Sequence, residues 1–346
     1  MQPRVHELDE FIALWKKTDG ILMDVRSSGE YLKAHIPSAL SLPLMDNEHR
    51  VIIGTTYKPQ GRQAAVLQGF ELIGPRFHEI ITEALKLAGE KEVFLYCWRG
   101  GMRSNITAWL LQMAGMKVHL LKGGYKTFRH WVLEQFQIQR TILVLGGSTG
   151  SGKTEMLELL KARKEQVVDL EAIANHRGSA YGPFGLPPQP SQEKFENLLA
   201  TALAATNPAE RLWLENESRA IGKITLPNQI YDMIRYSPMV EMQVPIAVRK
   251  DRILAEYGVF SKDELAEKTS NIERRLGGQH MKAALEHLEA GEMSSWLDII
   301  LKYYDKTYDF GTSQRQKEKV FHIAIQWSEK NVEVQKVLNT ANKSGS

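Results

Sequence analysis

An eight-residue glycine-rich segment, Gly147-Ser-Thr-Gly-Ser-Gly-Lys-Thr154, constrains the fold of this chain more than any other feature of its sequence. It follows a short apolar run, Thr141 to Leu145, and precedes a stretch whose apolar residues recur at helical spacing. A strand, a glycine-rich turn and a helix in this order form a phosphate-binding loop (P-loop), because backbone N–H groups at the helix N-terminus surround phosphate oxygens. The segment therefore predicts an α/β domain with a parallel sheet that begins near residue 138.

Three kinds of group in this loop would contact a bound phosphate. Gly147, Gly150 and Gly152 let the backbone curl closely around an anion. Lys153 would neutralise phosphate charge, and the Thr154 hydroxyl would be a ligand of Mg²⁺. Because the motif identifies a phosphate and not its fate, it leaves open whether a nucleotide is bound or hydrolysed.

The acidic residue that would organise such a metal has two candidates. Asp169 follows the apolar pair Val167-Val168, and Glu215 ends the run that starts at Arg211. Either could instead be a helix cap or a surface ion-pair partner. The sequence leaves this choice open.

Strand-like and helical stretches alternate on both sides of residue 138, whereas only helical stretches are evident after Val248. We expect a parallel-sheet α/β domain over residues 1–137, a P-loop α/β domain over 138–249 and a helical C-terminal region over 250–346. The small polar end from Asn339 is expected to lack order. The expected strands and helices of the first domain are Ile21 to Val25, Glu71 to Leu87, Glu92 to Tyr96, Ser104 to Met113, Val118 to Leu121 and Tyr125 to Gln139.

Cys97 is the single cysteine, so the chain can form neither an intrachain disulfide nor a Cys-rich zinc site. It ends an expected strand and begins the loop Cys97-Trp-Arg-Gly-Gly-Met-Arg-Ser104 ahead of a helix. The helix dipole, backbone N–H groups, Arg99 and Arg103 would all favour a thiolate there. We therefore predict a reactive thiol. The same spacing of Cys97 and Arg103 is found in Cys-dependent phosphatases, so the loop alone leaves two chemistries open.

The amino-acid composition excludes few classes of function. The chain has 44 Lys and Arg against 41 Asp and Glu, and a net charge of +3 does not by itself indicate a nucleic-acid partner. The first ten residues have no apolar signal core, and the apolar runs fall short of the ~20 residues that span a bilayer. We expect a cytoplasmic protein with no membrane partner.

The segments upstream of Cys97 resemble the first signature of the rhodanese family: Asp24-Val-Arg26, Glu30-Tyr31 and Ala34-His-Ile-Pro-Ser-Ala39. The resemblance covers about residues 5–137 and implies a sulfurtransferase fold whose cysteine, here Cys97, carries sulfur or selenium. We expect Asp24, Arg26 and Glu30 to pair with one another in a structural role.

A rhodanese-like domain upstream of a P-loop domain resembles the tRNA 2-selenouridine synthase family over nearly the whole chain. The resemblance rests on Asn47 to Gly61, Cys97 to Ser104, Lys122 to Lys126, Asp169 to Glu171, His176 to Ala180, Glu215 to Gly222 and Tyr303 to Asp305.

The family resemblance implies a two-step reaction on wobble 2-thiouridine in tRNA. Geranyl diphosphate first alkylates the sulfur, and selenium from selenophosphate then replaces the S-geranyl group. Cys97 would hold the selenium as an S-selanylcysteine, and the P-loop would suit geranyl diphosphate as well as a nucleotide. A selenophosphate-supplying enzyme is an implied partner. Cysteines that can occur in the P-loop of such proteins are replaced here by Ser148 and Ser151, so a relay between two thiols of one chain is excluded.

Contacts with tRNA would come from basic and aromatic side chains. The candidates are His176, Arg177, Arg274, Arg275 and Lys282, with Tyr303, Tyr304 and Tyr308 for base stacking. The main alternative function is a general rhodanese-type sulfurtransferase with a regulatory nucleotide-binding domain. A nucleotide-switched RNA-binding module is a third possibility.

Overall fold

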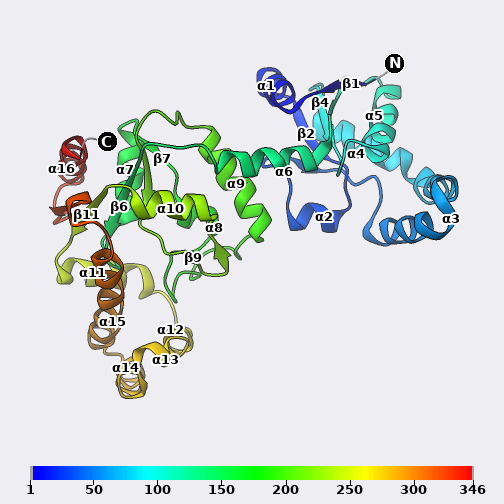
Figure 1. The fold of residues 1–346 in the computed structure, drawn as a ribbon. Helices are drawn as coiled ribbons and strands as arrows, with labels where there is room; N and C mark the ends of the chain where they lie inside the picture. Colours follow the sequence, from blue (N-terminus) through cyan, green and yellow to red (C-terminus); the bar gives the residue numbers. More distant parts are fainter. Residues whose placement is uncertain (1–2, 345–346) are drawn as a thin grey trace. The chain divides into compact units, whose positions relative to one another are not determined.

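The computed structural model describes residues 3–344, and the chain divides into two compact units (Figure 1). Unit 1 contains the residues up to Gln135 together with Glu196–Thr201, and unit 2 contains Phe136–Phe195 and the residues from Ala202 onward. Each unit is built around its own five-stranded parallel sheet, which confirms the predicted class of two successive α/β folds. The predicted boundaries at residues 137 and 249 stay predictions.

The sheet of unit 1 has the strand order β1-β5-β4-β2-β3. In the central strand, β4, every residue from Val93 to Tyr96 is buried, as expected for a parallel sheet that is covered on both faces. The register pairs Asp24 with Tyr96, so β2 and β4 end together and the Cys97 loop starts at this edge. The strands are β1 Arg4–His6, β2 Ile21–Asp24, β3 Leu40–Ser41, β4 Val93–Tyr96 and β5 Val118–Leu121.

The sequence did not predict three helices of unit 1: α1, α2 and the long helix α3. The expected helix from Glu71 to Leu87 is divided, because the 3-10 turn η1 at Gly74–Arg76 contains Pro75 and separates α3 from α4. The helices are α1 Leu8–Thr18, α2 Ser28–Lys33, α3 Asn47–Ile73, α4 Phe77–Ala88, α5 Met102–Met113 and α6 Gly124–Gln135.

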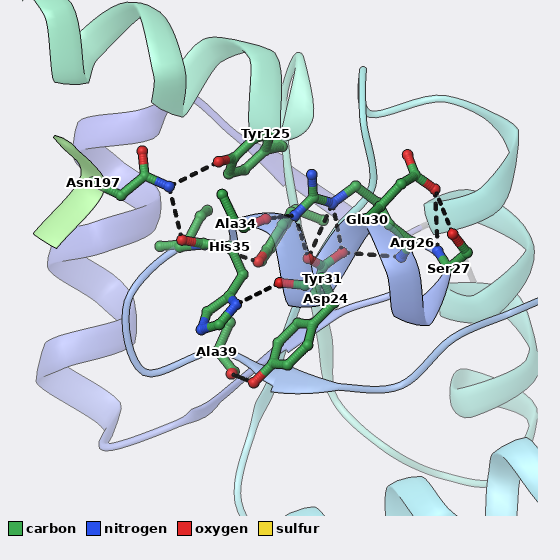
Figure 2. A network of polar contacts seen from close by, with 12 residues as sticks. Asp24, Arg26, Ser27, Glu30, Tyr31, Ala34, His35, Ala39, Tyr125 and Asn197 are labelled. Carbon is green, nitrogen blue, oxygen red and sulfur yellow. Dashed lines mark hydrogen bonds and ion pairs between the residues drawn. The ribbon is translucent and has the colours of Figure 1, made fainter. Parts of the chain in front are cut away.

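A short segment from far along the chain, Glu196–Thr201, completes unit 1. Its Asn197 is fully buried, and the amide donates to the Tyr125 hydroxyl at 2.7 Å and to the His35 carbonyl at 2.9 Å (Figure 2). Arg129 also donates to the Asn197 side-chain oxygen. Residues up to Gln135 therefore do not form all the polar contacts of this unit by themselves.

The sheet of unit 2 has the order β12-β11-β6-β8-β7, which places the strand before the P-loop in the centre. Its strands are β6 Ile142–Gly147, β7 Gln166–Val167, β8 Leu212–Glu215, β11 Met239–Gln243 and β12 Val320–Ala324, and an antiparallel ribbon joins β9 Ala220–Ile221 to β10 Ile224–Thr225. The helices are α7 Lys153–Ala162, α8 Leu170–Ala174, α9 Gln192–Ala204, α10 Asn228–Tyr236, α11 Ile246–Tyr257, α12 Lys262–Ser270, α13 Glu273–Leu276, α14 Gly278–Ala290, α15 Met293–Ser313 and α16 Lys330–Lys343.

The C-terminal part of unit 2 is mostly helical, as predicted, but two details differ. Strand β12 joins the sheet beside β11, although its charged flanks conceal it in the sequence. The expectation of an unordered end from Asn339 is wrong for the residues up to Lys343, because α16 buries Val337 and Ala341 in the core of the sheet. Across residues 3–344, no helix combines the length and apolar character needed to cross a bilayer.

Candidate functional site

The P-loop of unit 2 follows β6 and leads directly into α7, as the motif predicts. Gly150 and Gly152 have φ values of 78° and 85°, a left-handed conformation that side chains rarely adopt. A Cβ at Gly152 would lie 2.6 Å from the Trp327 ring, so this position also lacks space for a side chain.

Three side chains donate hydrogen bonds to carbonyl oxygens of the loop. Arg249 donates to Thr149 at 2.9 Å, Trp327 donates to Ser151 at 2.8 Å, and Lys153 donates to Gly147 at 2.9 Å. Two of these donors, Arg249 and Trp327, come from α11 and from the segment after β12. The conformation of the loop is thus fixed from outside in a form suited to anion binding.

Tyr308 of α15 holds the first peptide of the loop. Its hydroxyl accepts from the Gly147 N–H at 2.5 Å and from the Asn216 amide at 3.1 Å. The Asn216 oxygen in turn accepts from Arg315 at 2.8 Å. Since the Tyr308 oxygen accepts two hydrogen bonds, its own proton can be donated to a ligand.

A cavity of about 1210 Å³ opens over the P-loop. It is larger than the usual 300–1,000 Å³ of small-molecule sites, so it has room for a ligand beyond a phosphate group. Its lining combines the loop with basic and aromatic side chains, among them Arg177, Arg252, Arg275, Tyr303, Tyr304 and Tyr308.

Two carboxyl groups, Glu171 and Glu217, line the same cavity and hydrogen-bond to each other. Their oxygens converge on Gly178, where a Cβ would lie 3.0 Å from one oxygen of Glu217 and 3.1 Å from one of Glu171. Burial and the neighbouring carboxylate raise the pKa of Glu217 to about 8, and burial also raises the pKa of Glu171. The pair therefore holds a proton at neutral pH.

The positive charge of Lys153 balances the negative charge of these carboxyl groups. Burial alone would lower the pKa of Lys153, but Tyr308, Glu171 and Glu217 raise it above its ordinary value. Lys153 is therefore cationic and suited to neutralise a diphosphate.

Neither acid predicted to organise a metal lines the cavity. Glu215 ends β8 beside the P-loop strand, but it is fully buried and accepts from the Leu170 N–H at 2.9 Å. Asp169 caps α8 by accepting from the Ala172 N–H at 2.7 Å. Two of the acids that do line it, Glu171 and Glu217, each lie two residues further along the chain than these candidates.

Thr154 lies in the first turn of α7 and lines the cavity, so its hydroxyl could reach a Mg²⁺ ion there. Within residues 3–344 no group of three or more His, Cys, Asp or Glu residues is placed to hold a metal. A Mg²⁺ ion would fit here only if ligand phosphates and water supplied most of its coordination, which is its usual mode of binding.

The thiol of unit 1 lies between β4 and α5, at a helix N-terminus as predicted. Cys97 is only 3% exposed, and its sulfur accepts from the Gly101 N–H at 3.3 Å and lies 3.2 Å from the Ser104 hydroxyl. A Cβ at Gly124 would lie 2.2 Å from the Cys97 carbonyl, so the loop packs closely on the backbone of the segment Lys122 to Lys126.

The two arginines of this loop differ in their surroundings. Arg103 donates to Glu30 at 2.6 Å, and this interaction keeps the pKa of Glu30 below its ordinary value although burial would raise it. Arg99 is exposed. The positive charge of Arg103 is therefore shared with a carboxylate, and its role at the thiol stays a prediction.

The predicted pairing of Asp24 and Arg26 is present in a buried network (Figure 2). Arg26 is 2% exposed, donates to Asp24 at 2.6 Å and to the Ala34 carbonyl at 2.6 Å, and lies 3.8 Å from the centre of the Tyr125 ring. Glu30 pairs with Arg103 instead. This arrangement supports a structural role for Asp24 and Arg26.

The predicted tRNA-contact residues are not all grouped together. Arg177, Arg275 and the three tyrosines line the cavity of unit 2. His176 is buried, and burial lowers its pKa, so it is poorly placed to contact a phosphate as a cation. Arg274 and Lys282 do not line this cavity.

Several residues that line the cavity or hydrogen-bond the P-loop were not singled out for their roles by the sequence. Glu217 lies within the segment from Glu215 to Gly222, so the motif marks its neighbourhood. Arg249, Trp327 and Arg315 carry no local signal, because each contacts residues about 80 or more positions away.

Comparison with known proteins matches both units. The family model described as the tRNA 2-selenouridine synthase AAA domain matches residues 140–343, and that of the rhodanese-like domain matches residues 7–130. The tRNA 2-selenouridine synthase of Shewanella piezotolerans is 35% identical over 91% of this chain and 96% of its own. Those of Shewanella denitrificans and Nitrosomonas europaea are 34% and 32% identical, over 87% and 90% of this chain and 90% and 93% of their own.

Proposed function

Because the chain belongs to the tRNA 2-selenouridine synthase family, we propose that it replaces the sulfur of wobble 2-thiouridine in tRNA by selenium. One observation carries the proposal beyond the family name. The chain combines a thiol at a helix N-terminus, in unit 1, with a cation-lined cavity over a P-loop, in unit 2. These are the two sites that a chalcogen carrier and a diphosphate-dependent transferase require.

The cavity of unit 2 is the site that we propose for geranyl diphosphate. Lys153 and the N–H groups of the P-loop would bind the diphosphate, and the volume leaves space for an apolar chain. The thiouridine sulfur attacks the first carbon of the geranyl group, the carbon–oxygen bond breaks and diphosphate leaves. S-alkylation turns a poor thiocarbonyl leaving group into a thiolate that can be displaced.

Cys97 is the selenium carrier in this proposal, with selenophosphate as the donor. An external disulfide accepts the two electrons that formation of the sulfur–selenium bond releases and becomes two thiols, while water takes the phosphoryl group as phosphate. The selenium on Cys97 then attacks C2 of the alkylated uridine and expels geranylthiolate. One external thiol cleaves the bond between selenium and the Cys97 sulfur, which frees the selenouridine and leaves a mixed disulfide on Cys97. A second external thiol restores Cys97 and regenerates the external disulfide, since the chain has no second cysteine. Gly101 and Ser104, which contact the sulfur, would stabilise negative charge there.

The test is nucleoside mass spectrometry on tRNA that contains 2-thiouridine. The protein receives geranyl diphosphate first and selenophosphate second, and we expect S-geranyl-2-thiouridine followed by 2-selenouridine. Unchanged nucleoside in intact, thiolated tRNA would reject the proposal. Formation of thiocyanate from thiosulfate and cyanide without tRNA would then favour the general sulfurtransferase.

A further inference from the structure

Helix α3 is a helical hairpin that has little contact with the core of unit 1. Its 27 residues are kinked at Gly61, where φ is 81°, and only Ala65, Gly69 and Ile73 are buried. The two halves contact each other, because the Thr56 hydroxyl donates to Gln68. We call this hairpin, Asn47–Ile73, the arm; Figure 1 shows it at the rim of unit 1.

The arm exposes large apolar and aromatic side chains. Five of them have between 38% and 65% of their surface accessible: Val51, Ile52, Tyr57, Leu67 and Phe70. A helix on the surface of a soluble protein usually turns such residues toward the core. A surface of this kind is typical of a binding site.

The charge of the arm indicates the class of partner. The two acids of the arm, Glu48 and Glu71, lie at its ends, and between residues 49 and 70 the sequence has no Asp or Glu, while Arg50, Lys58 and Arg62 are basic. Lys58 and Arg62 are exposed, and neither forms an ion pair with another residue between 3 and 344. Free cations beside exposed aromatic rings suit a polyanion with stackable bases, which is single-stranded or looped RNA.

The base of the arm lies beside the cysteine loop. Arg50 in the first turn of α3 lies 4.0 Å from Glu30, and Glu30 accepts from Arg103 at 2.6 Å. The residue after Arg103 is Ser104, whose hydroxyl contacts the Cys97 sulfur at 3.2 Å. A nucleic acid on the arm would therefore be close to the thiol.

We propose that the arm binds the looped region of the tRNA substrate and brings it to Cys97. Lys58 and Arg62 contact phosphates, and Tyr57 and Phe70 stack on unpaired bases. This inference rests on the proposed function and adds the surface by which unit 1 holds its substrate.

The experiment measures the Kd of the full chain for thiolated tRNA at several salt concentrations. The variant Lys58→Ala/Arg62→Ala should weaken binding by about tenfold or more, and the slope of log K against log salt should become shallower by about 1.4 to 1.8, because two phosphate contacts are lost. The matched control is Lys16→Ala/Lys17→Ala, which removes two exposed cations from α1 of the same unit. It should keep both the affinity and the slope.

Stacking is tested by Tyr57→Ala and Tyr57→Phe. The first should weaken binding and 2-selenouridine formation, and the second should retain both because it keeps the ring. The rate at which Cys97 is alkylated should be unchanged in every variant, which shows that unit 1 is folded.

The outcomes distinguish a failure of the arm proposal from a failure of the proposed function. If the wild type forms 2-selenouridine and the arm variants bind tRNA equally well, the arm proposal is wrong and the function stands. If those variants instead lose self-association, the arm is a protein interface and the proposal is again wrong. If the wild type neither binds nor modifies tRNA, the proposed function fails and the arm proposal fails with it.

Discussion

Cys97 and Lys153 belong to different units, and each is expected to serve a different step. Cys97→Ala should abolish selenium incorporation and leave geranylation largely intact, because in the proposed reaction the thiol only carries selenium. Lys153→Ala should reduce geranylation strongly, since the proposed diphosphate site loses one cation. Mass spectrometry of both nucleosides distinguishes the steps.

The control for the lysine is Lys161→Ala, at the exposed end of the same helix α7. It should retain geranylation. Equal loss of both activities in the cysteine variant would contradict this division between the units.

The raised pKa of Glu217 predicts how the stability of unit 2 depends on pH. Its pKa rises from an ordinary 4.5 to about 8 on folding, so the folded state holds a proton that the unfolded state releases. The resulting stabilisation is complete below pH 4.5 and is lost as pH rises through about 8. Glu217→Gln imitates the protonated acid, so calorimetric unfolding of unit 2 should depend less on pH in this window.

The control for this titration is Glu158→Gln, an exposed glutamate of α7 that also lines the cavity. The calorimetric unfolding of unit 2 in this variant should depend on pH as it does in the wild type. An unchanged pH dependence in Glu217→Gln would show that Glu217 does not hold the proton.

At the scale of elements, strands β1 and β5 are joined by a chain of ionisable side chains. His6 and His119 share a hydrogen bond of 2.9 Å, and His119 contacts Glu92 at 2.8 Å. Burial lowers the pKa of His119 below its ordinary 6.5, although Glu92 opposes this. The pairing is therefore stable above pH 6.5 and should weaken as pH falls below it.

Hydrogen exchange of the β1 and β5 amides, corrected for intrinsic rates, measures this effect. His119→Gln should remove most of the acid sensitivity, because glutamine does not titrate in this range. His130→Gln, an exposed histidine of α6, should leave it unchanged. Acid sensitivity that persists in His119→Gln would assign the titration to another group.

The helices and strands also show how much of the fold and of the candidate site can be predicted from the sequence. Strand β6, the P-loop and α7 were predictable because glycine spacing and apolar periodicity agree there. Helix α3 was not, since Gly54, Gly61 and Pro59 indicate a loop and its apolar residues do not follow one face. Arg249, Tyr308 and Trp327 could not be assigned to the P-loop, because only tertiary packing brings them there.

At the scale of the whole molecule, the chain returns to unit 1 through Glu196–Thr201, so the unit depends on residues far from its own sequence. Asn197→Ala should destabilise unit 1 by about 1–3 kcal/mol, because it leaves buried polar groups unpaired. Cys97 is buried, so its alkylation rate in urea reports the opening of this unit alone.

The exposed Thr201 of the same segment provides the control, and Thr201→Ala should alkylate at nearly the wild-type rate. If Asn197→Ala also protects Cys97 as well as the wild type does, the returning segment contributes little to unit 1.

Trp327 is a fluorescent residue that contacts the proposed phosphate site of unit 2. Its indole N–H bonds to the Ser151 carbonyl, its ring lies 4.5 Å from the Arg252 guanidinium, and its backbone has a φ of 59°. An anion that enters the loop changes the electric field at this ring, so the emission wavelength should shift on binding of inorganic diphosphate and should not shift in Trp327→Phe. The intrinsic tryptophan fluorescence can then report ligand occupancy, without a label and before any tRNA is added.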